Sequence, residues 1–335
     1  MERVLTAMGL AWALPSKNGN PISMRERLDM FTRAFAVPLI GVLIFLGIWN
    51  FSASRIETSL GVVPGPVQVW QQAVNLVDEH NAERDKAIAF YERQEKRNAK
   101  KLAKDPDAKI KVRKYTGKPT FFDQIWTSIF TVFSGFILAT IIAVPIGIIC
   151  GMSPTAYSAM NPLIQVFKPV SPLAWLPIVT IIVSAVYVTK DPLFAKSFVT
   201  SAITVTLCCM WPTIINTTVG VSNIDRDLLN VSRVLRLNWW THVWKIVIPS
   251  SIPMIFAGLR LSLGIGWMVL IAAEMLAQNP GLGKFVWDEF QNGSSNSLGR
   301  IMVAVLVIGI IGFLLDRLML QLQRWVSWDK SQALR

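Results

Sequence analysis

Residues 227–249 read DLLNVSRVLRLNWWTHVWKIVIP. This charged, tryptophan-rich stretch lies between two long apolar runs, at about 198–219 and 252–277. Apolar runs of about 18 or more residues with few charges are typical of membrane-spanning helices. The pattern therefore predicts a structured loop that leaves the membrane between two spans.

The composition of the whole chain also indicates an integral membrane protein. Of its 335 residues, 52% are hydrophobic and only 16% are charged, whereas a soluble domain carries about 25% charged residues. The net charge is +12. Basic loops beside membrane spans explain this charge better than nucleic-acid binding, because the sequence has no zinc-ligand, stacking or basic-helix motif.

The cysteines and histidines indicate neither disulfides nor a metal site. Cys150, Cys208 and Cys209 lie inside or at the edge of apolar runs, without metal-ligand spacing, and are expected to serve as packing residues. His80 and His242 are the only two histidines, which excludes a histidine-rich metal site. We therefore expect no metal and no cofactor bound by this chain itself.

Six apolar runs predict six membrane spans, at about 34–51, 125–150, 173–188, 198–219, 252–277 and 301–320. Pro169 and Pro172 lie just before the third run, and Pro177 lies inside it. Proline disturbs helix interiors. Six spans put both termini on one side, and the basic residues that flank the first, fourth, fifth and sixth spans identify that side as the cytoplasm. The predicted fold class is an all-α membrane protein with about six spans, a cytoplasmic coupling helix and a helical periplasmic insertion.

These spans divide the chain into five parts. They are a cytoplasmic N-terminal segment (1–33), the first span (34–51), a periplasmic connection (52–122), a core (123–320, with its loop near 222–249) and a cytoplasmic tail (321–335). The short apolar run at 4–14 is either a signal peptide or an interfacial helix. We favour the interfacial helix, because Glu2 lies in the leader and the next span follows directly.

The periplasmic connection contains a highly charged segment. Residues 78–118 hold 13 Lys and Arg against 8 Asp and Glu, which conflicts with an outside location, although the positive-inside rule is weak for loops longer than about 60 residues. Residues 67–102 are rich in Glu, Lys, Ala and Gln and predict a helix. We expect a solvated helical hairpin or spur; a docking platform for a binding protein is the alternative.

The loop at 222–249 has its own helical pattern. Ser222 or Asp225 is expected to cap a helix that begins near Arg226. Leu228, Val231 and Leu235 then form one apolar stripe. Asn238 is expected to take a left-handed turn, followed by a second short helix over 239–247. The pair is either an interfacial element anchored by tryptophans or a compact helix that fits a groove on a cytosolic partner.

Here the sequence resembles the permease subunits of binding-protein-dependent ABC importers. Those subunits carry a cytoplasmic loop of pattern EAA-xxx-G, followed after a spacer by I-x-L-P. This chain has Asn230, Val231 and Ser232 in place of EAA, has Arg236 in place of the glycine, and ends in IVIP at 246–249. The stretches 161–179, 228–237, 258–276 and 281–288 resemble the nitrate, bicarbonate and cyanate permeases, with taurine and sulfonate permeases as near relatives. The resemblance covers about 120–320.

The resemblance implies a transmembrane subunit that pairs as a homodimer in the bacterial inner membrane. ATP and Mg²⁺ would be bound by cytosolic ATPase subunits, and a periplasmic or lipid-anchored binding protein would deliver a small anion, nitrate first among the candidates. The ATPase-coupling loop would comprise Asp227, Leu228, Leu229, Asn230, Val231, Ser232, Arg233, Arg236, Leu237 and Asn238.

A second set of residues is predicted to lie on the substrate path: Ser171, Trp175, Arg260, Trp267 and Glu274. Arg260 and Glu274 are the only charges in the fifth span, and intramembrane charges are candidates for function. Arg260 alternatively snorkels to the headgroups. Glu274 alternatively pairs with Lys284 or caps the next turn. Because Arg260 is the one basic side chain inside a predicted span near the axis, we expect selectivity to lie mainly in the binding protein.

Three glycines of the fifth span, Gly258, Gly264 and Gly266, are expected to let helices approach closely. The chain lacks a GxxxxGK[ST] loop, a GxSxG elbow, HExxH and CxxC, so it is not expected to be an enzyme. The rival functions are a stand-alone secondary carrier, for which no inverted repeat is visible, and a membrane scaffold.

Overall fold

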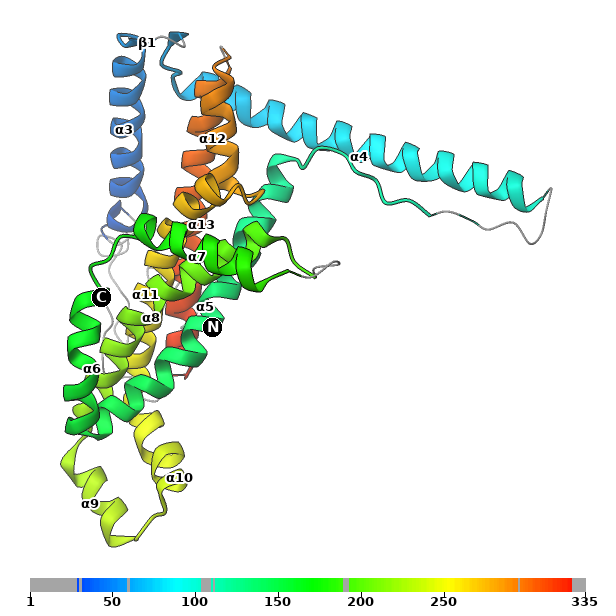
Figure 1. Cartoon of the computed structure of the whole chain (residues 1–335). Helices are drawn as coiled ribbons and strands as arrows, with labels where there is room; N and C mark the ends of the chain where they lie inside the picture. The colour runs from blue at the N-terminus through cyan, green and yellow to red at the C-terminus, as the bar shows by residue number, and fades with distance from the viewer. Residues whose placement is uncertain are drawn as a thin grey trace, which may run out of the picture.

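The computed structural model describes residues 29, 32–58, 61–103, 110, 112–188, 193–294 and 296–326, and these are almost entirely helical (Figure 1). A two-residue antiparallel hairpin, β1 (Glu57–Thr58) and β2 (Gly61–Val62), is the exception. The all-α prediction is confirmed. The predicted interfacial helix at 4–14 and residues 327–335 of the predicted tail lie outside the described residues.

Four long helices form the bundle. They are α5 (Phe121–Met152), α8 (Lys196–Ser222), α11 (Ile248–Ala277) and α13 (Ser297–Val326), with α11 continuing a helical stretch that begins at Trp239. Each has the length and apolar composition to cross a membrane. α8 packs between α5 and α11, and a shared core forms there because Val132, Cys209 and Leu263 are buried. Each of the second, fourth, fifth and sixth predicted spans therefore corresponds to a long apolar helix.

The third predicted span, at 173–188, corresponds to the second helix of a bent pair. Two helices, α6 (Pro154–Phe167) and α7 (Pro172–Val186), meet at an angle of 101° across residues 168–171. Pro169 and Pro172 have no N–H to continue the ladder, so the chain changes direction between them. Counting the bent pair as one span gives up to five long spans.

The helix of the first predicted span is shorter than the four long helices. α3 (Val37–Ala53) has 17 residues and follows a π-helical turn, η2 (Thr32–Ala36). Most of its side chains are apolar and exposed. A helix of 17 residues is about 25 Å long, at the lower limit of what crosses a bilayer.

The charged insertion is a spur. α4 (Pro66–Leu102) is a single helix of 37 residues, so the hairpin alternative is wrong. It projects crosswise to the long helices, at the end of the bundle opposite α9 (Arg226–Val234) and α10 (Trp239–His242) (Figure 1). Arg300 of α13 forms an ion pair with Glu79 at its base.

An extended segment returns along the spur. The Tyr115 N–H donates to the Tyr91 hydroxyl (3.1 Å), and the Tyr115 hydroxyl donates to the Glu83 carboxylate (2.7 Å). The hydrogen bond from this hydroxyl is the main reason that the pKa of Glu83 lies below its ordinary value. The Glu83 carboxylate in turn raises the pKa of Tyr115.

Two of the three glycines of the fifth span mediate close contact. A Cβ at Gly266 would lie 2.5 Å from Cys209 Sγ, and one at Gly258 would lie 2.7 Å from Asn216 Cβ. Both atoms belong to α8. Gly264 has no heavy atom within 4 Å of such a Cβ, so the expectation is wrong for Gly264, which is exposed on another face of α11.

Candidate functional site

The first candidate site is the loop between α8 and α11. α9 begins at an N-cap, Asp225, whose carboxylate accepts the N–H of Asp227 (3.0 Å). Ser222, the alternative cap, instead donates its hydroxyl to the Gly151 carbonyl (3.3 Å). The structure therefore selects Asp225 and ties the end of α8 to the end of α5.

α9 ends in a Schellman motif. The Leu237 N–H donates to the Ser232 carbonyl and the Arg236 N–H donates to the Arg233 carbonyl, both at 3.1 Å. This motif places a left-handed residue, usually glycine, just after the helix. Arg236 has that conformation, with φ of 46°, and it occupies the position of the glycine in the importer pattern.

The predicted left-handed turn at Asn238 is wrong. Asn238 has a φ of −65° and caps α10, because its side-chain oxygen accepts the Thr241 N–H (2.8 Å). The predicted second short helix is present as α10 followed by a π-helical turn, η3 (Val243–Val247).

Contacts between side chains fix the loop to the bundle. Ser232 Oγ and His242 Nδ1 are 2.7 Å apart, which joins α9 to α10. Val243 and Val247 are buried in one cluster with Val221 and other residues at the ends of α5 and α8. The loop is therefore a folded part of the bundle end.

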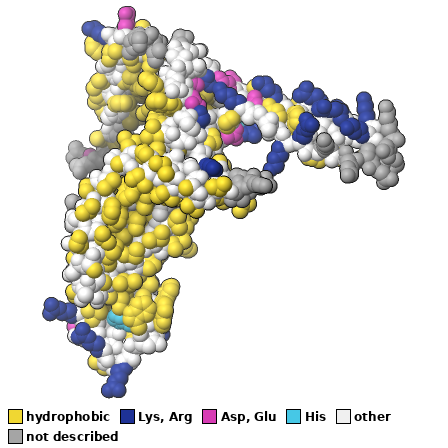
Figure 2. Space-filling model, viewed as in Figure 1, with side chains coloured by type: hydrophobic (Ala, Val, Ile, Leu, Met, Phe, Trp, Pro, Cys, Tyr) yellow, Lys and Arg dark blue, Asp and Glu magenta, His cyan; other side chains and the backbone are white. Residues whose placement is uncertain are grey.

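The outward face of the loop is apolar and basic. The predicted stripe of Leu228, Val231 and Leu235 is exposed, by 44%, 50% and 63%, and arginine and lysine side chains lie at the tip of the loop and along one side of it (Figure 2). Trp239, Trp240 and Trp244 are exposed as well. An apolar helical stripe left open at the end of a bundle is suited to a groove on a partner.

Glu274 has a structural position. Its buried carboxylate accepts the Ser128 hydroxyl (2.8 and 2.9 Å) and the Gly283 N–H (3.0 Å) at the start of α12 (Leu282–Asn292). Lys284 instead pairs with Asp288 (2.7 Å). The capping alternative is confirmed, and the pairing with Lys284 is wrong. Glu274 joins α5, α11 and α12.

Arg260 and Trp267 both connect α11 to α13. The Arg260 guanidinium forms a two-point ion pair with Asp316, one contact being 2.9 Å. The buried Trp267 indole N–H donates to the Ile308 carbonyl (3.0 Å). Neither residue lines the cavities described next, and the sequence analysis missed the partner Asp316.

Ser171 and Trp175 do line a cavity. It has a volume of about 390 Å³ and lies between the break of the bent pair and the middle of α8 and α11. Ser171 caps α7 by accepting the Leu173 N–H (3.3 Å), and Trp175 packs on Phe167, with ring centroids 5.6 Å apart. The structure thus brings together two of the five predicted path residues.

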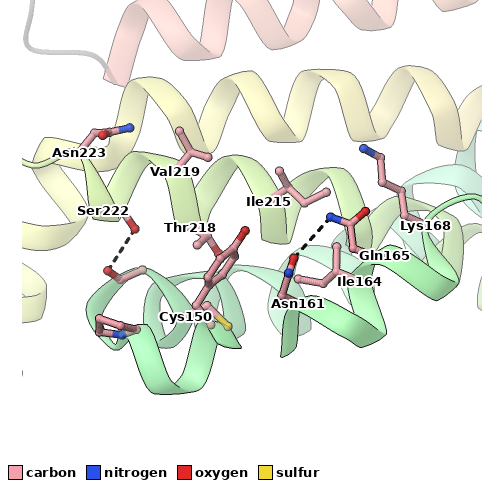
Figure 3. A pocket seen from close by; sticks show the side chains of 13 residues that line it. Cys150, Asn161, Ile164, Gln165, Lys168, Ile215, Thr218, Val219, Ser222 and Asn223 are labelled. Atoms are coloured by element: carbon pink, nitrogen blue, oxygen red, sulfur yellow. Dashed lines mark hydrogen bonds between the residues drawn. The ribbon is translucent and has the colours of Figure 1, made fainter. Parts of the chain in front are cut away.

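A second cavity, of about 410 Å³, lies among α5, α6 and α8 (Figure 3). Asn161, Gln165 and Lys168 project into it from α6 and its end. Lys168 also lines the first cavity. Lys168 lies outside every predicted span. Lys168 was missed because the third span was predicted to begin at 173.

Comparisons with known proteins agree with this architecture. Residues 143–328 match the family described as binding-protein-dependent transport system inner membrane component. The chain is 30% identical to the nitrate import permease protein NrtB of Synechocystis sp., over 93% of this chain and 94% of that protein. It is 31% identical to the bicarbonate transport system permease protein CmpB of Synechococcus elongatus, over 90% and 91%.

A solved structure has a similar fold. An inward-facing form of the MetNI methionine ABC transporter superposes with a TM-score of 0.53 at 13% identity, over 62% of this chain and 96% of that chain. The family match covers more than half of the residues, and the relatives align over nearly their whole length. This chain belongs to the family of binding-protein-dependent transport system inner membrane components.

Proposed function

We propose that this chain is the transmembrane permease subunit of an ATP-driven importer for a small oxyanion, nitrate or bicarbonate. The observation that carries the proposal is the likeness to a nitrate permease and a bicarbonate permease over at least 90% of each chain. The pocket with Ser171 and Trp175 is large enough for such an anion. A taurine or sulfonate permease is the related alternative.

The exposed stripe of α9 supports a role as the coupling helix. It would seat in the groove of a cytosolic ATPase subunit, two copies of this chain would form the pathway, and an external binding protein would deliver the anion. ATP and Mg²⁺ would be bound by the ATPase subunits. Closure of those subunits would push on α9 and α10 and open the path alternately to each side.

Co-purification with the ATPase subunits tests the coupling role. Val231→Glu places a charge in the exposed stripe and should abolish copurification, because a charge buried in an apolar groove is strongly unfavourable. Val67→Glu is the control, since Val67 is an exposed valine on α4 (77% exposed), at the end of the bundle opposite α9, and it should leave copurification intact. Retention of the ATPase by Val231→Glu would refute the assignment. A stand-alone carrier would bring no ATPase at all.

Transport by the reconstituted complex tests the substrate. With the binding protein present, ATP-dependent uptake of nitrate or bicarbonate is expected, and uptake of taurine alone would select the alternative. Orientation is tested separately, with a cysteine at the exposed Ala99 on α4. That cysteine should react with an impermeant thiol reagent from the periplasmic side. Labelling only from the cytoplasm would show that the spur lies on the cytoplasmic side and that the predicted topology is wrong.

A further inference from the structure

The two cavities lie one after the other along α8. The cavity of Figure 3 extends to the end of α8 that adjoins α9, where Cys150 and Ser222 line it. The other cavity lies against the middle of α8, at Cys208 and Trp211. Lys168 and Ile215 are the two residues that line both. The side chain of Lys168 is therefore placed where the two cavities meet.

Lys168 differs from the other cations of the bundle. Arg260 pairs with Asp316 and lines neither cavity, whereas Lys168 lines both cavities and has no carboxylate within ion-pair distance among residues 112–188, 193–294 and the other described parts. No aspartate or glutamate lines either cavity. Lys168 is exposed and lines both cavities, so its charge is available to an anion in either of them.

The cavity beside the break also offers hydrogen-bond donors. Trp211 lines it, and its indole N–H is buried without a partner among the described residues. An indole nitrogen can only donate, so an acceptor is missing. The Asn216 amide donates one hydrogen to the Pro212 carbonyl (2.8 Å) and keeps a second. The N-terminus of α7, which favours negative charge, opens on the same cavity at Ser171.

The remaining wall is apolar. Trp175 of α7 and Leu261, Ile265 and Val269 of α11 also line the cavity. An apolar cavity with a few convergent donors and one cation is a typical small-ligand site. Because only a few donors converge here, binding would be weak enough for the ligand to leave again.

We infer that the cavity at the break between α6 and α7 binds the transported oxyanion, with Lys168 as its cation and Trp211 as a donor. The inference rests on the proposed function and names the site at which that function would operate. From Lys168 the anion has access to the cavity that leads to the α9 end. The bent helix pair thus places a positive charge where the two cavities meet.

Uptake of nitrate and bicarbonate by the full complex in proteoliposomes, with ATPase subunits and binding protein, tests the inference. Lys168→Gln removes the charge and should lower the initial uptake rate at least tenfold. Lys168→Arg keeps the charge and should stay within threefold of wild type. Lys100→Gln makes the same charge change on the exposed spur and should have no effect. Stimulation of ATP hydrolysis by the loaded binding protein should persist in all three.

A second variant covers the case in which Lys168→Gln does not assemble. Trp211→Phe keeps an aromatic ring and removes the orphan N–H, and it should lower uptake about threefold. Wild-type uptake in Lys168→Gln or Trp211→Phe, or equal losses in Lys168→Gln and Lys168→Arg, would overturn the inference. Failure of the wild-type complex to take up either anion would instead overturn the proposed function, and this inference with it.

Discussion

The left-handed conformation of Arg236 leads to a sharp prediction about the end of α9. A residue with a Cβ in this conformation costs about 1.5 kcal/mol more than in a right-handed one. Glycine escapes this cost but loses about 0.7 kcal/mol through the larger freedom of its unfolded chain. Arg236→Gly should therefore stabilise the Schellman motif by about 0.8 kcal/mol, because both of its hydrogen bonds are between backbone atoms and remain possible.

The neighbouring residue is a matched control of opposite sign. Leu235 has a φ of −76°, so Leu235→Gly gains nothing from the conformation and should destabilise the helix end by about 0.8 kcal/mol. Arg236→Asn removes the same charge as Arg236→Gly, and asparagine tolerates the left-handed region. The stability of the helix end in Arg236→Asn should lie between that of the wild type and that of Arg236→Gly.

Native-state hydrogen exchange of the Leu237 amide measures these differences directly, because that amide is bonded to the Ser232 carbonyl. A change of about 0.8 kcal/mol corresponds to roughly a fourfold change in the exchange rate. We expect slower exchange in Arg236→Gly and faster exchange in Leu235→Gly. The reasoning fails if both glycine variants exchange faster than wild type, or if Arg236→Asn and Arg236→Gly are equal and the effect is one of charge.

Three further predictions concern the packing of the bundle and the spur. Glu274→Ala leaves a buried N–H and a hydroxyl without an acceptor and should lower the free energy of unfolding by about 3 kcal/mol, whereas Glu274→Gln keeps one acceptor oxygen and should lower it less. Hydrogen exchange at the start of α12 distinguishes the two variants, and equal protection in both would contradict the capping role. Gly266→Ala should destabilise the bundle by about 1–3 kcal/mol, because its Cβ overpacks against Cys209. Gly264→Ala, in open space, should be neutral or should stabilise the bundle by up to about 1 kcal/mol. Thermal melting in detergent compares the two variants, and equal melting midpoints would contradict this reasoning. The Tyr115 hydroxyl lowers the pKa of Glu83, and the pKa of Tyr115 is itself raised. Their hydrogen bond should therefore weaken as the pH falls below the ordinary carboxyl value of 4.5 and as it rises above the ordinary phenol value of 10.0. The anisotropy of a fluorophore at residue 114 should fall at both extremes of pH, and Tyr115→Phe should remove that dependence.

The sequence was most informative where a property depends on neighbouring residues. Apolar runs predicted the four long helices, and the polar, helix-forming composition of 67–102 predicted α4 with a boundary error of one residue at its start. The cap at Asp225 and the short helices of the loop also follow from local pattern. The membrane fold and the helices of the loop between α8 and α11 could therefore be predicted before any contact was known.

The surroundings of the predicted path residues were harder to predict because they depend on contacts that are distant in sequence. Arg260 is neutralised by Asp316, 56 residues away, and nothing in the spacing indicates that pairing. Lys168 was overlooked because hydropathy measures composition and does not show that the chain turns through 101° at the prolines. Only this turn brings the lysine to the cavities along α8.

The helical stretch from Trp239 to Ala277 is continuous over 39 residues, or about 58 Å. One end carries the exposed tryptophans of α10, and near the other end Glu274 holds the first turn of α12. One continuous helical element therefore connects the loop at one end of the bundle to the start of α12 at the other. Its π-helical turn at Val243–Val247 is held in the bundle end by the burial of both valines.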